Sequence, residues 1–241
     1  MEAYTNDIIM QIRNLDVSYD GKLVLHDISM DIRKNRITAI LGPSGCGKTT
    51  FLKTLNGLLQ EERGAKVSGR ISLEGTEIQQ VSQETLRKNV GLVFQTPAPF
   101  PFSIYKNLTY APVYYGIRDK KKLAEIVEEK LKLTGLYEEV SGELHKSALK
   151  LSGGQKQRLC IARALTVEPK VLLLDEPCSA LDVKASAKIE ELLLKLRERY
   201  TIVIVTHNLA QAKRVADDVA FFQDGRLVEA KMAKEFWEHP E

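Results

Sequence analysis

The sequence predicts an α/β protein in which a mostly parallel sheet carries an antiparallel β subdomain and an inserted α-helical subdomain. Three observations indicate this class. Continuous apolar runs of strand length recur along the chain, a helical pattern separates two of them, and residues 103–165 contain helical patterns without a convincing strand. Continuous runs are typical of strands buried on both faces, as in parallel sheets.

The first third of the chain predicts two antiparallel strands with one solvated face. Apolar residues there stand near alternating positions among polar ones, which is the period of a half-buried strand. The apolar positions are Met10, Ile12, Leu15 and Val17, followed by Ile28, Met30 and Ile32.

The parallel strands are predicted from compact apolar runs. Between the last two runs, apolar residues at helical spacing predict a crossover helix, which a parallel pair requires. The runs are 37–41, 90–94, 171–174 and 201–206, and the helical positions are Ile189, Leu192, Leu193 and Leu196.

The helical insertion is predicted from residues 120–133, an amphipathic stretch whose apolar side is Leu123, Ile126, Val127 and Leu131. Residues 97–102 (PAPFPF) precede it and are not expected to be helical, because each proline pushes its predecessor toward extended geometry. We therefore expect one structural unit over 1–241. Its core is 1–95 and 166–241, and its helical subdomain is 96–165.

The charge balance and the length of the apolar runs exclude several classes of protein. The 241 residues carry 35 basic and 32 acidic side chains, a net charge of +3, so we expect no nucleic-acid partner. A spanning helix needs about 20 apolar residues, and the chain has no such run. Residues 1–10 do not show the basic segment followed by an apolar segment that is typical of a secretory signal.

The cysteines indicate the redox setting. Three cysteines without a Cys-x-x-Cys spacing argue against a disulfide framework or zinc knuckle, so we expect a reducing cytosol and no redox role for the cysteines.

A glycine-rich turn follows the run 37–41 and precedes a helix-forming segment. It matches G-x-x-x-x-G-K-[ST], whose glycines let consecutive N–H groups form an anion nest at a helix start. Lys48 is expected to reach the β- and γ-phosphates and Thr49 to bind Mg²⁺. The motif predicts a P-loop NTPase core that binds the phosphates of a nucleotide. The expected contacts are Gly42, Pro43, Ser44, Gly45, Cys46, Gly47, Lys48, Thr49 and Thr50.

Two adjacent carboxylates end the run 171–174. The carboxyl end of a strand is the ligand-binding edge of an open α/β sheet, and successive side chains on a strand point opposite ways. We expect Asp175 to hold Mg²⁺ and Glu176 to face the attacking water as general base. The alternative is a capped strand end with two solvated acids.

A second glycine-rich turn, Ser152-Gly153-Gly154-Gln155, lies before a helical run at 156–165. It is either a second phosphate-contacting turn at a helix start or only a helix cap, since serine is a good N-cap residue. The residues by themselves favour neither interpretation.

Together, the phosphate loop, LSGGQ and DEP, in this order and spacing, resemble the nucleotide-binding subunit of ABC transporters over nearly the whole chain. The resemblance implies a RecA-like core with the ABC ATPase fold. It also implies roles for further residues. Gln95 resembles the Q-loop glutamine that senses Mg²⁺ and the permease, His207 the switch histidine at the γ-phosphate, and Tyr19 the aromatic that stacks on adenine. Ser179 to Asp182 resembles the D-loop.

In this family two subunits pair head to tail, so that the LSGGQ turn of one closes over ATP held by the other. The resemblance therefore implies a homodimer in which Ser152, Gly153, Gly154, Gln155 and Asp182 contact the partner's nucleotide. It explains why one chain has two phosphate-binding turns.

Residues 94–105, 144–155, 158–165 and 172–182 are similar to phosphate importer ATPases in particular. The resemblance implies two transmembrane permease subunits, a solute-binding protein, and a peripheral position on the cytoplasmic face of the membrane. Residues 100–105 (FPFSIY) follow the Q-loop glutamine, where family members receive the permease's coupling helix. Packing within the helical subdomain is the alternative for these aromatic residues.

The expected function is therefore ATP hydrolysis in an ABC importer, with inorganic phosphate as the solute. Glu176, His207, Lys48 and Gln95 are the expected catalytic residues. Another solute, such as a polar amino acid or oxyanion, is the first alternative. A non-transport ABC ATPase is disfavoured because the chain lacks sustained heptads and a second phosphate loop, and a module that binds ATP without hydrolysis because Glu176 and His207 are both present.

Overall fold

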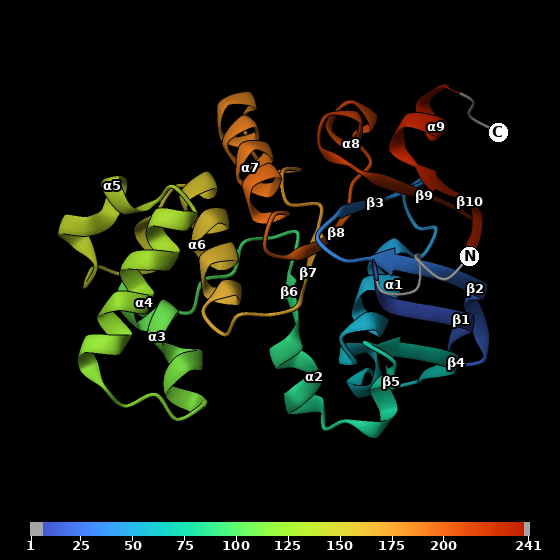
Figure 1. Ribbon diagram of the computed structural model, residues 1–241, viewed down its shortest axis with the longest axis horizontal. Coiled ribbons are helices and arrows are strands. Elements are labelled where there is room, and N and C mark those ends of the chain that lie inside the picture. Colours follow the sequence, from blue (N-terminus) through green and yellow to red (C-terminus); the bar gives the residue numbers. More distant parts are fainter. Residues whose placement is uncertain (1–6, 239–241) are drawn as a thin grey trace.

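Two sheets and a group of helices form the structure, and the helices α3 to α6 lie to one side of both sheets (Figure 1). The computed structural model describes residues 7–238. Residues 1–6 and 239–241, which belong to the predicted unit 1–241, lie outside the described residues. The strands are β1 (Ile8–Tyr19), β2 (Lys22–Arg33), β3 (Ile37–Leu41), β4 (Ala65–Leu73), β5 (Thr76–Glu77), β6 (Val90–Val93), β7 (Val171–Asp175), β8 (Thr201–Val205), β9 (Asp218–Gln223) and β10 (Arg226–Met232).

The helices begin and end as follows. They are α1 (Lys48–Leu55), α2 (Gln83–Asn89), α3 (Ile104–Tyr114), α4 (Lys120–Leu133), α5 (Tyr137–Val140), α6 (Gly153–Leu165), α7 (Val183–Leu196), α8 (Leu209–Val215) and α9 (Ala233–Glu238). Short 3₁₀ helices occupy Leu58–Glu61, Ile78–Gln80, Ser141–Glu143 and Ala148–Lys150. Among residues 7–238, no helix is both long and apolar enough to cross a membrane.

The larger sheet has the strand order β10-β9-β3-β8-β7-β6, and all its neighbouring strands are parallel except β10 with β9. Every residue of β3, β7 and β8 is buried, which confirms the predicted parallel core. Two predicted strands were one residue too long. β6 ends at Val93 and β8 at Val205, because the chain there leaves the sheet, and Phe94 is 46% exposed.

The smaller sheet, β2-β1-β4-β5, is antiparallel and buries one face, as predicted for the first two strands. Asp20 and Gly21 connect β1 to β2 with φ of 48° and 83°, a two-residue turn that needs left-handed backbone at both positions. β9 and β10 are joined in the same way by Asp224 and Gly225. Strands β4, β5, β9 and β10 were not predicted from the sequence.

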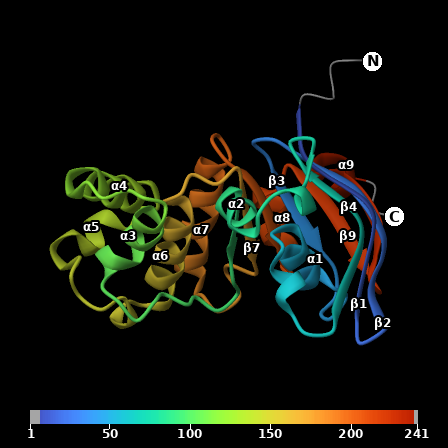
Figure 2. The same cartoon turned by 90° about the horizontal axis from the view of Figure 1, so that it is seen from below.

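Helix α1 lies between the two sheets. Its Phe51, Leu52 and Leu55 are fully buried in one apolar core with residues of β1, β2 and the larger sheet. Because successive side chains of a strand point to opposite faces, Ile40 of β3 joins this core, whereas Ile37, Ala39 and Leu41 join a second core beneath α6 to α9. Figure 2 shows the antiparallel sheet at the end of the molecule opposite the helices α3 to α5.

The helices α3 to α6 have an apolar core of their own, which includes Leu108, Val127 and Leu131. The predicted helix 120–133 is present with the same bounds as α4. Helix α6 contributes Leu159 to this core and Ile161 to the second core, which lies between the larger sheet and α6 to α9. It therefore joins the helical subdomain to the rest of the molecule by apolar packing.

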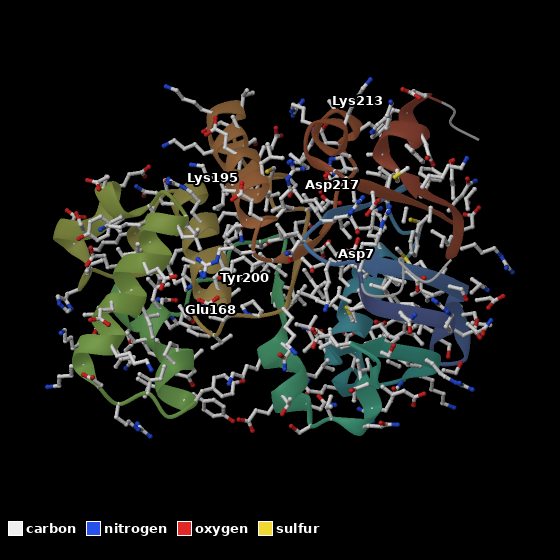
Figure 3. The ribbon with its side chains drawn as sticks, viewed as in Figure 1. Asp7, Glu168, Lys195, Tyr200, Lys213 and Asp217 are labelled. Carbon is white, nitrogen blue, oxygen red and sulfur yellow. The ribbon has the colours of Figure 1, made fainter. Side chains whose placement is uncertain are left out.

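A polar contact joins the same two parts. Glu168, in the connection after α6, accepts hydrogen bonds from the buried Lys130 of α4 and from the Tyr200 hydroxyl, the latter at 2.6 Å (Figure 3). Burial by itself would raise the pKa of Glu168, but these two hydrogen bonds hold it below its usual value. The buried ammonium group of Lys130 thus has a charged partner, as a buried charge requires.

Candidate functional site

The candidate site lies at one edge of the larger sheet. Because β3, β6, β7 and β8 are parallel, their carboxyl ends meet at the same edge, where open α/β sheets bind ligands. The phosphate loop follows β3, Gln95 follows β6, Glu176 follows β7 and His207 follows β8. Four segments that are far apart in the chain therefore bring the predicted residues to one place.

The phosphate loop connects β3 to α1, the strand-to-helix context that the motif requires. Gly42 has φ of 143°, and a Cβ atom there would lie 2.1 Å from the Phe222 carbonyl oxygen, so no other residue fits. Gly47 precedes α1 in left-handed geometry, and no side chain of the described residues caps the helix amides. These N–H groups are therefore available to an anion.

Lys48 is the first residue of α1 and is only 6% exposed. Its Nζ donates hydrogen bonds to the carbonyl oxygens of Gly42 (2.8 Å) and Pro43 (2.7 Å), and lies 3.8 Å from the Cys46 sulfur. The ammonium group is thus held against the loop. The remaining predicted contacts lie in the loop or at the start of α1, namely Ser44, Gly45, Thr49 and Thr50. The three cysteines are free thiols.

Asp175 and Thr49 form the candidate metal site. Thr49 Oγ1 donates a hydrogen bond of 2.9 Å to Asp175 Oδ2, whereas Asp175 Oδ1 is buried without a partner among the described residues. Burial raises the pKa of Asp175. An unpaired buried carboxylate oxygen beside a hydroxyl fits a divalent cation with hard oxygen ligands such as Mg²⁺. Within residues 7–238 no cluster of three or more His, Cys, Asp or Glu offers another metal site.

Glu176 faces different partners from Asp175, as the alternation along the strand predicts. Its Oε2 accepts a hydrogen bond of 3.1 Å from Gln95 Nε2 and lies 3.0 Å from His207 Nδ1. The backbone at Glu176 has φ of 43°, so the chain turns sharply at the strand end. The Glu176 side chain is 18% exposed and that of His207 59%, which leaves the cluster open to solvent and substrate.

Tyr19 ends β1, and its ring packs against the apolar core that contains α1. The Tyr19 hydroxyl donates a hydrogen bond of 2.7 Å to Glu62, which Lys53 of α1 also binds. Burial, together with this hydrogen bond, raises the pKa of Tyr19 to about 12. The ring is therefore held in one position near the phosphate-loop helix. Stacking on adenine stays a prediction.

The turn Ser152–Gln155 is a helix start. Ser152 is the N-cap residue of α6, and it exchanges two hydrogen bonds with Gln155, the backbone N–H of each bonding the side chain of the other. This is a capping box. The predicted helix 156–165 therefore began three residues too late, because the capping box starts the helix at Gly153. The turn is therefore a helix cap, as one of the two interpretations predicted. Its contact with phosphate stays a prediction.

The structure does not bring this turn to the phosphate loop of the same chain. Ser152 and its neighbours line a groove of 320 Å³ together with Ala180, Leu181 and Asp182 of the D-loop segment. Helices α6 and α1, which follow the two turns, lie well apart in both views (Figures 1 and 2). Asp182 caps α7, since its Oδ1 accepts a hydrogen bond of 2.8 Å from the Ala185 amide.

Glu139, which no sequence pattern indicated, holds the turn Ser152–Gln155 (the signature turn). Glu139 accepts a hydrogen bond of 3.0 Å from Gln155 Nε2, and both of its oxygens lie 2.9 Å from Arg158 Nη2. Hydrogen bonding by Arg158 lowers the pKa of Glu139 to about 2. The S-x-x-Q pattern could have revealed the capping box, but Glu139 lies 16 and 19 residues from these partners, and no local pattern links them.

Replacing Glu139 by glutamine is expected to lower stability at neutral pH but hardly at pH 2. The folded-state pKa lies below the usual 4.5, so ionised Glu139 stabilises the fold above about pH 4.5, and this contribution is lost as the pH falls toward 2. We expect roughly 1–2 kcal/mol, because about 1.4 kcal/mol per pH unit is reduced by solvent screening at a side chain that is 30% exposed. Urea unfolding of both proteins at pH 6 and pH 2.5 checks this, and an equal difference at the two pH values would contradict it.

Comparisons with known proteins agree with this geometry. A family model described as ABC transporter matches residues 25–179, more than half of the chain. The phosphate import ATP-binding protein PstB of Borreliella burgdorferi is 50% identical over 237 residues, which cover 98% of this chain and 91% of the relative. PstB of Borrelia garinii subsp. bavariensis is 49% identical over 241 residues, which cover 99% and 93%.

Two solved structures share the fold. The cbiO1 structure from Clostridium perfringens, part of the ABC transporter complex cbiONQ, superimposes with a TM-score of 0.86 at 33% identity and covers 97% of this chain and 92% of that one. A bacterial Atm1-family ABC exporter with ATP bound gives 0.82 at 29% identity, covering 98% of this chain and 41% of the exporter chain. From the family model, the full-length relatives and the strand-end site together, it follows that the chain belongs to the ABC transporter family, as one of its ATP-binding subunits.

Proposed function

We propose that the chain is the ATP-hydrolysing subunit of an ABC importer for inorganic phosphate. The proposed ATPase activity rests on one observation. Gln95 and His207 both contact the Glu176 carboxylate, next to the Thr49–Asp175 pair. The proposed solute rests on the phosphate import proteins that are about half identical to this chain over nearly its full length.

Each residue has a role that follows from its place. Lys48 and the loop amides bind the β- and γ-phosphates of ATP, and the Tyr19 ring stacks on the base. Thr49, Asp175 and Gln95 would hold Mg²⁺, which would neutralise phosphate charge when bound. Glu176 orients a water molecule and accepts its proton, and its carboxylate is kept in place by Gln95 and His207. His207 and Lys48 stabilise charge at the γ-phosphate.

The active form proposed is a head-to-tail homodimer. The signature turn lines a groove with the D-loop segment, and the helices α6 and α1 that follow the signature turn and the phosphate loop lie well apart in both views (Figures 1 and 2). A second copy, placed head to tail, supplies Ser152, Gly153, Gly154 and Gln155 to that loop's ATP, with Asp182 nearby. Two such sites form per dimer, and ATP closes the interface.

The permease contact is proposed at an apolar groove of 610 Å³ between β6 and the helices α3 and α6. Phe94, Tyr110 and Tyr114 line it and are 46–64% exposed. Phe100 also lines it, with the Arg163 guanidinium 4.2 Å from its ring centre, so this ring both packs within the chain and borders the groove. Two permeases bound here place the dimer peripherally on the cytoplasmic face of the membrane, in a complex that includes a solute-binding protein.

Changing Tyr114 to glutamate is expected to abolish co-purification with the permease without weakening ATP binding. Tyr114 is 64% exposed, so a charge there does not disturb the core, but it is costly in an apolar interface. Affinity purification from the native cell, followed by mass spectrometry of the membrane subunits, measures the loss. Leu23→Glu, the same kind of change at a 47% exposed residue of β2, is the control and is expected to retain the permease. Equal permease recovery from both variants would rule out this groove.

The function itself is tested by ATP hydrolysis, by the identity of the permeases, and by phosphate uptake in cells with and without the chain. We expect Mg²⁺-dependent hydrolysis, phosphate permeases, and uptake that needs this chain. Recovery of amino-acid permeases, or uptake unchanged by deletion, would overturn the phosphate assignment. A purified chain that binds ATP without hydrolysing it, alone and with its permeases, would overturn the ATPase.

A further inference from the structure

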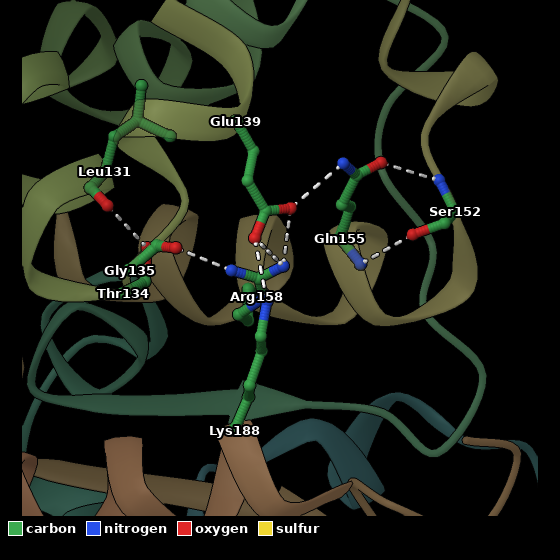
Figure 4. Close-up of polar contacts among 8 residues, drawn as sticks. All are labelled: Leu131, Thr134, Gly135, Glu139, Ser152, Gln155, Arg158 and Lys188. Carbon is green, nitrogen blue, oxygen red and sulfur yellow. Dashed lines mark hydrogen bonds and ion pairs between the residues drawn. The ribbon is translucent and has the colours of Figure 1, made fainter. Parts of the chain in front are cut away.

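Glu139 connects the signature turn to a helix of the sheet core. Besides Gln155 and Arg158 of α6, its carboxylate accepts a hydrogen bond of 3.0 Å from Lys188 Nζ of α7 (Figure 4). Gln155 in turn forms the capping box with Ser152. A chain of direct polar contacts therefore runs from Lys188 on α7 through Glu139 to the N-cap residue of α6.

The two cations on Glu139 differ in their surroundings. The Arg158 side chain is 6% exposed, and its Nη1 also donates a hydrogen bond of 2.6 Å to the Gly135 carbonyl oxygen, so it is fixed within the helical subdomain. Lys188 is 55% exposed and comes from the other side of the groove. Removing Lys188 therefore breaks the connection between the two parts without leaving a buried charge unpaired.

The same two helices also pack closely at their first turns. A Cβ atom on Gly154 would lie 3.0 Å from the Ala185 Cβ atom, so α6 and α7 approach each other with little room to spare. Ala185 donates to Asp182, the residue that caps α7 and ends the D-loop segment. The signature turn and the D-loop segment are thus adjacent, and the Glu139–Lys188 pair spans the groove that they share.

We propose that Glu139 is a positioning residue that, through Lys188, fixes the orientation of the signature turn relative to the D-loop segment (Ser179 to Asp182). The two segments then meet the ATP of a second copy as one preformed surface. Without the pair, the turn has to be ordered again at each dimer closure, which slows hydrolysis. This role rests on the proposed function, because it supposes that the turn acts on ATP held by a partner.

The test uses the full chain and four variants, Glu139→Gln, Lys188→Gln, Lys188→Arg and Glu138→Gln, each compared with the native protein. Hydrogen–deuterium exchange of residues 152–158 reads the positioning directly. Mg²⁺-dependent ATP hydrolysis, and titration with a fluorescent ATP analogue, read its consequence.

We expect Glu139→Gln and Lys188→Gln to speed exchange in residues 152–158. Both are expected to lower kcat by about tenfold, since small misplacements of groups at a reaction site cost large factors in rate. Binding of the analogue to each chain's own phosphate loop should change less than about twofold, because Glu139 and Lys188 line the groove of the signature turn and not the phosphate loop. Lys188→Arg retains a cation and should restore both readouts. Glu138→Gln, the neighbouring exposed glutamate of α5, should behave as the native chain.

Native-like exchange in both Glu139→Gln and Lys188→Gln would overturn the proposal, and so would faster exchange with an unchanged kcat. Equal loss in Lys188→Arg and Lys188→Gln would also overturn it, because the role would then not depend on the charge. If the native chain hydrolyses no ATP, the proposed function fails, while exchange in residues 152–158 still decides whether Glu139 and Lys188 hold the turn.

Discussion

Replacing Glu176 by glutamine is expected to leave ATP binding intact, to lower hydrolysis by at least about 10²-fold, the usual contribution of a general base, and to accumulate the ATP-bound dimer. The amide keeps the size of the side chain and can still accept from Gln95, which donates to Glu176 Oε2 in the native protein. It cannot accept a proton from water. The nucleotide contacts expected at Lys48 and the loop amides come from a different strand end and are unaffected.

Steady-state phosphate release, titration with labelled ATP, and sedimentation with and without ATP measure these three expectations. Glu191→Gln, an exposed carboxylate of α7, is the matched control and should hydrolyse ATP at the native rate. Turnover by Glu176→Gln at the native rate would remove Glu176 from the chemistry. Loss of binding would instead indicate a structural role at the strand end.

Lys48→Ala is expected to weaken nucleotide binding itself. The Lys48 ammonium group is held against the phosphate loop by the carbonyl oxygens of Gly42 and Pro43, the position from which it is expected to meet the phosphates. A hydrogen bond to a charged group contributes about 1.5–3 kcal/mol, so we expect roughly a ten- to hundredfold higher dissociation constant for ATP. Hydrolysis then falls because little ATP is bound.

Titration with labelled ATP measures the effect, and thermal unfolding without nucleotide shows whether the loop still folds. Lys120→Ala, an exposed residue at the start of α4, is the control and should bind as the native chain does. An unchanged dissociation constant in Lys48→Ala would contradict the phosphate-binding role of the loop lysine. A lost folding transition would show that the ammonium group serves the loop alone.

Much of the fold could be predicted because its strands are locally encoded. The run at β3 is apolar at nearly every position and is buried at all of them, so the sequence alone predicts burial on both faces. β4 (Ala65–Leu73) is different. Most of its residues are exposed or half-buried, and it is a strand because it pairs with β1, where Met10 lies opposite Leu73. A partner so far away in the chain leaves no local pattern.

The hairpin of β9 and β10 could have been predicted from its turn residues. Asp224 and Gly225 are the residue types that a two-residue turn with left-handed backbone prefers, and both take positive φ. The same holds for the start of α6, since Ser152 and Gln155 have the spacing of a capping box. In each case the signal lay in turn or cap chemistry and not in the apolar pattern, which has no information on where a helix is capped.

The sequence by itself determined which residues can do chemistry, since a phosphate loop, a strand ending in two acids and a signature turn are each a few consecutive residues with local geometry. Only the tertiary structure decided which of them meet. Gln95, Glu176 and His207 form one cluster because the parallel strands before them end at the same edge. Glu139 reaches Gln155 and Lys188 because three helices pack around one groove. Such contacts depend on the packing of many side chains across the chain, which no short segment specifies.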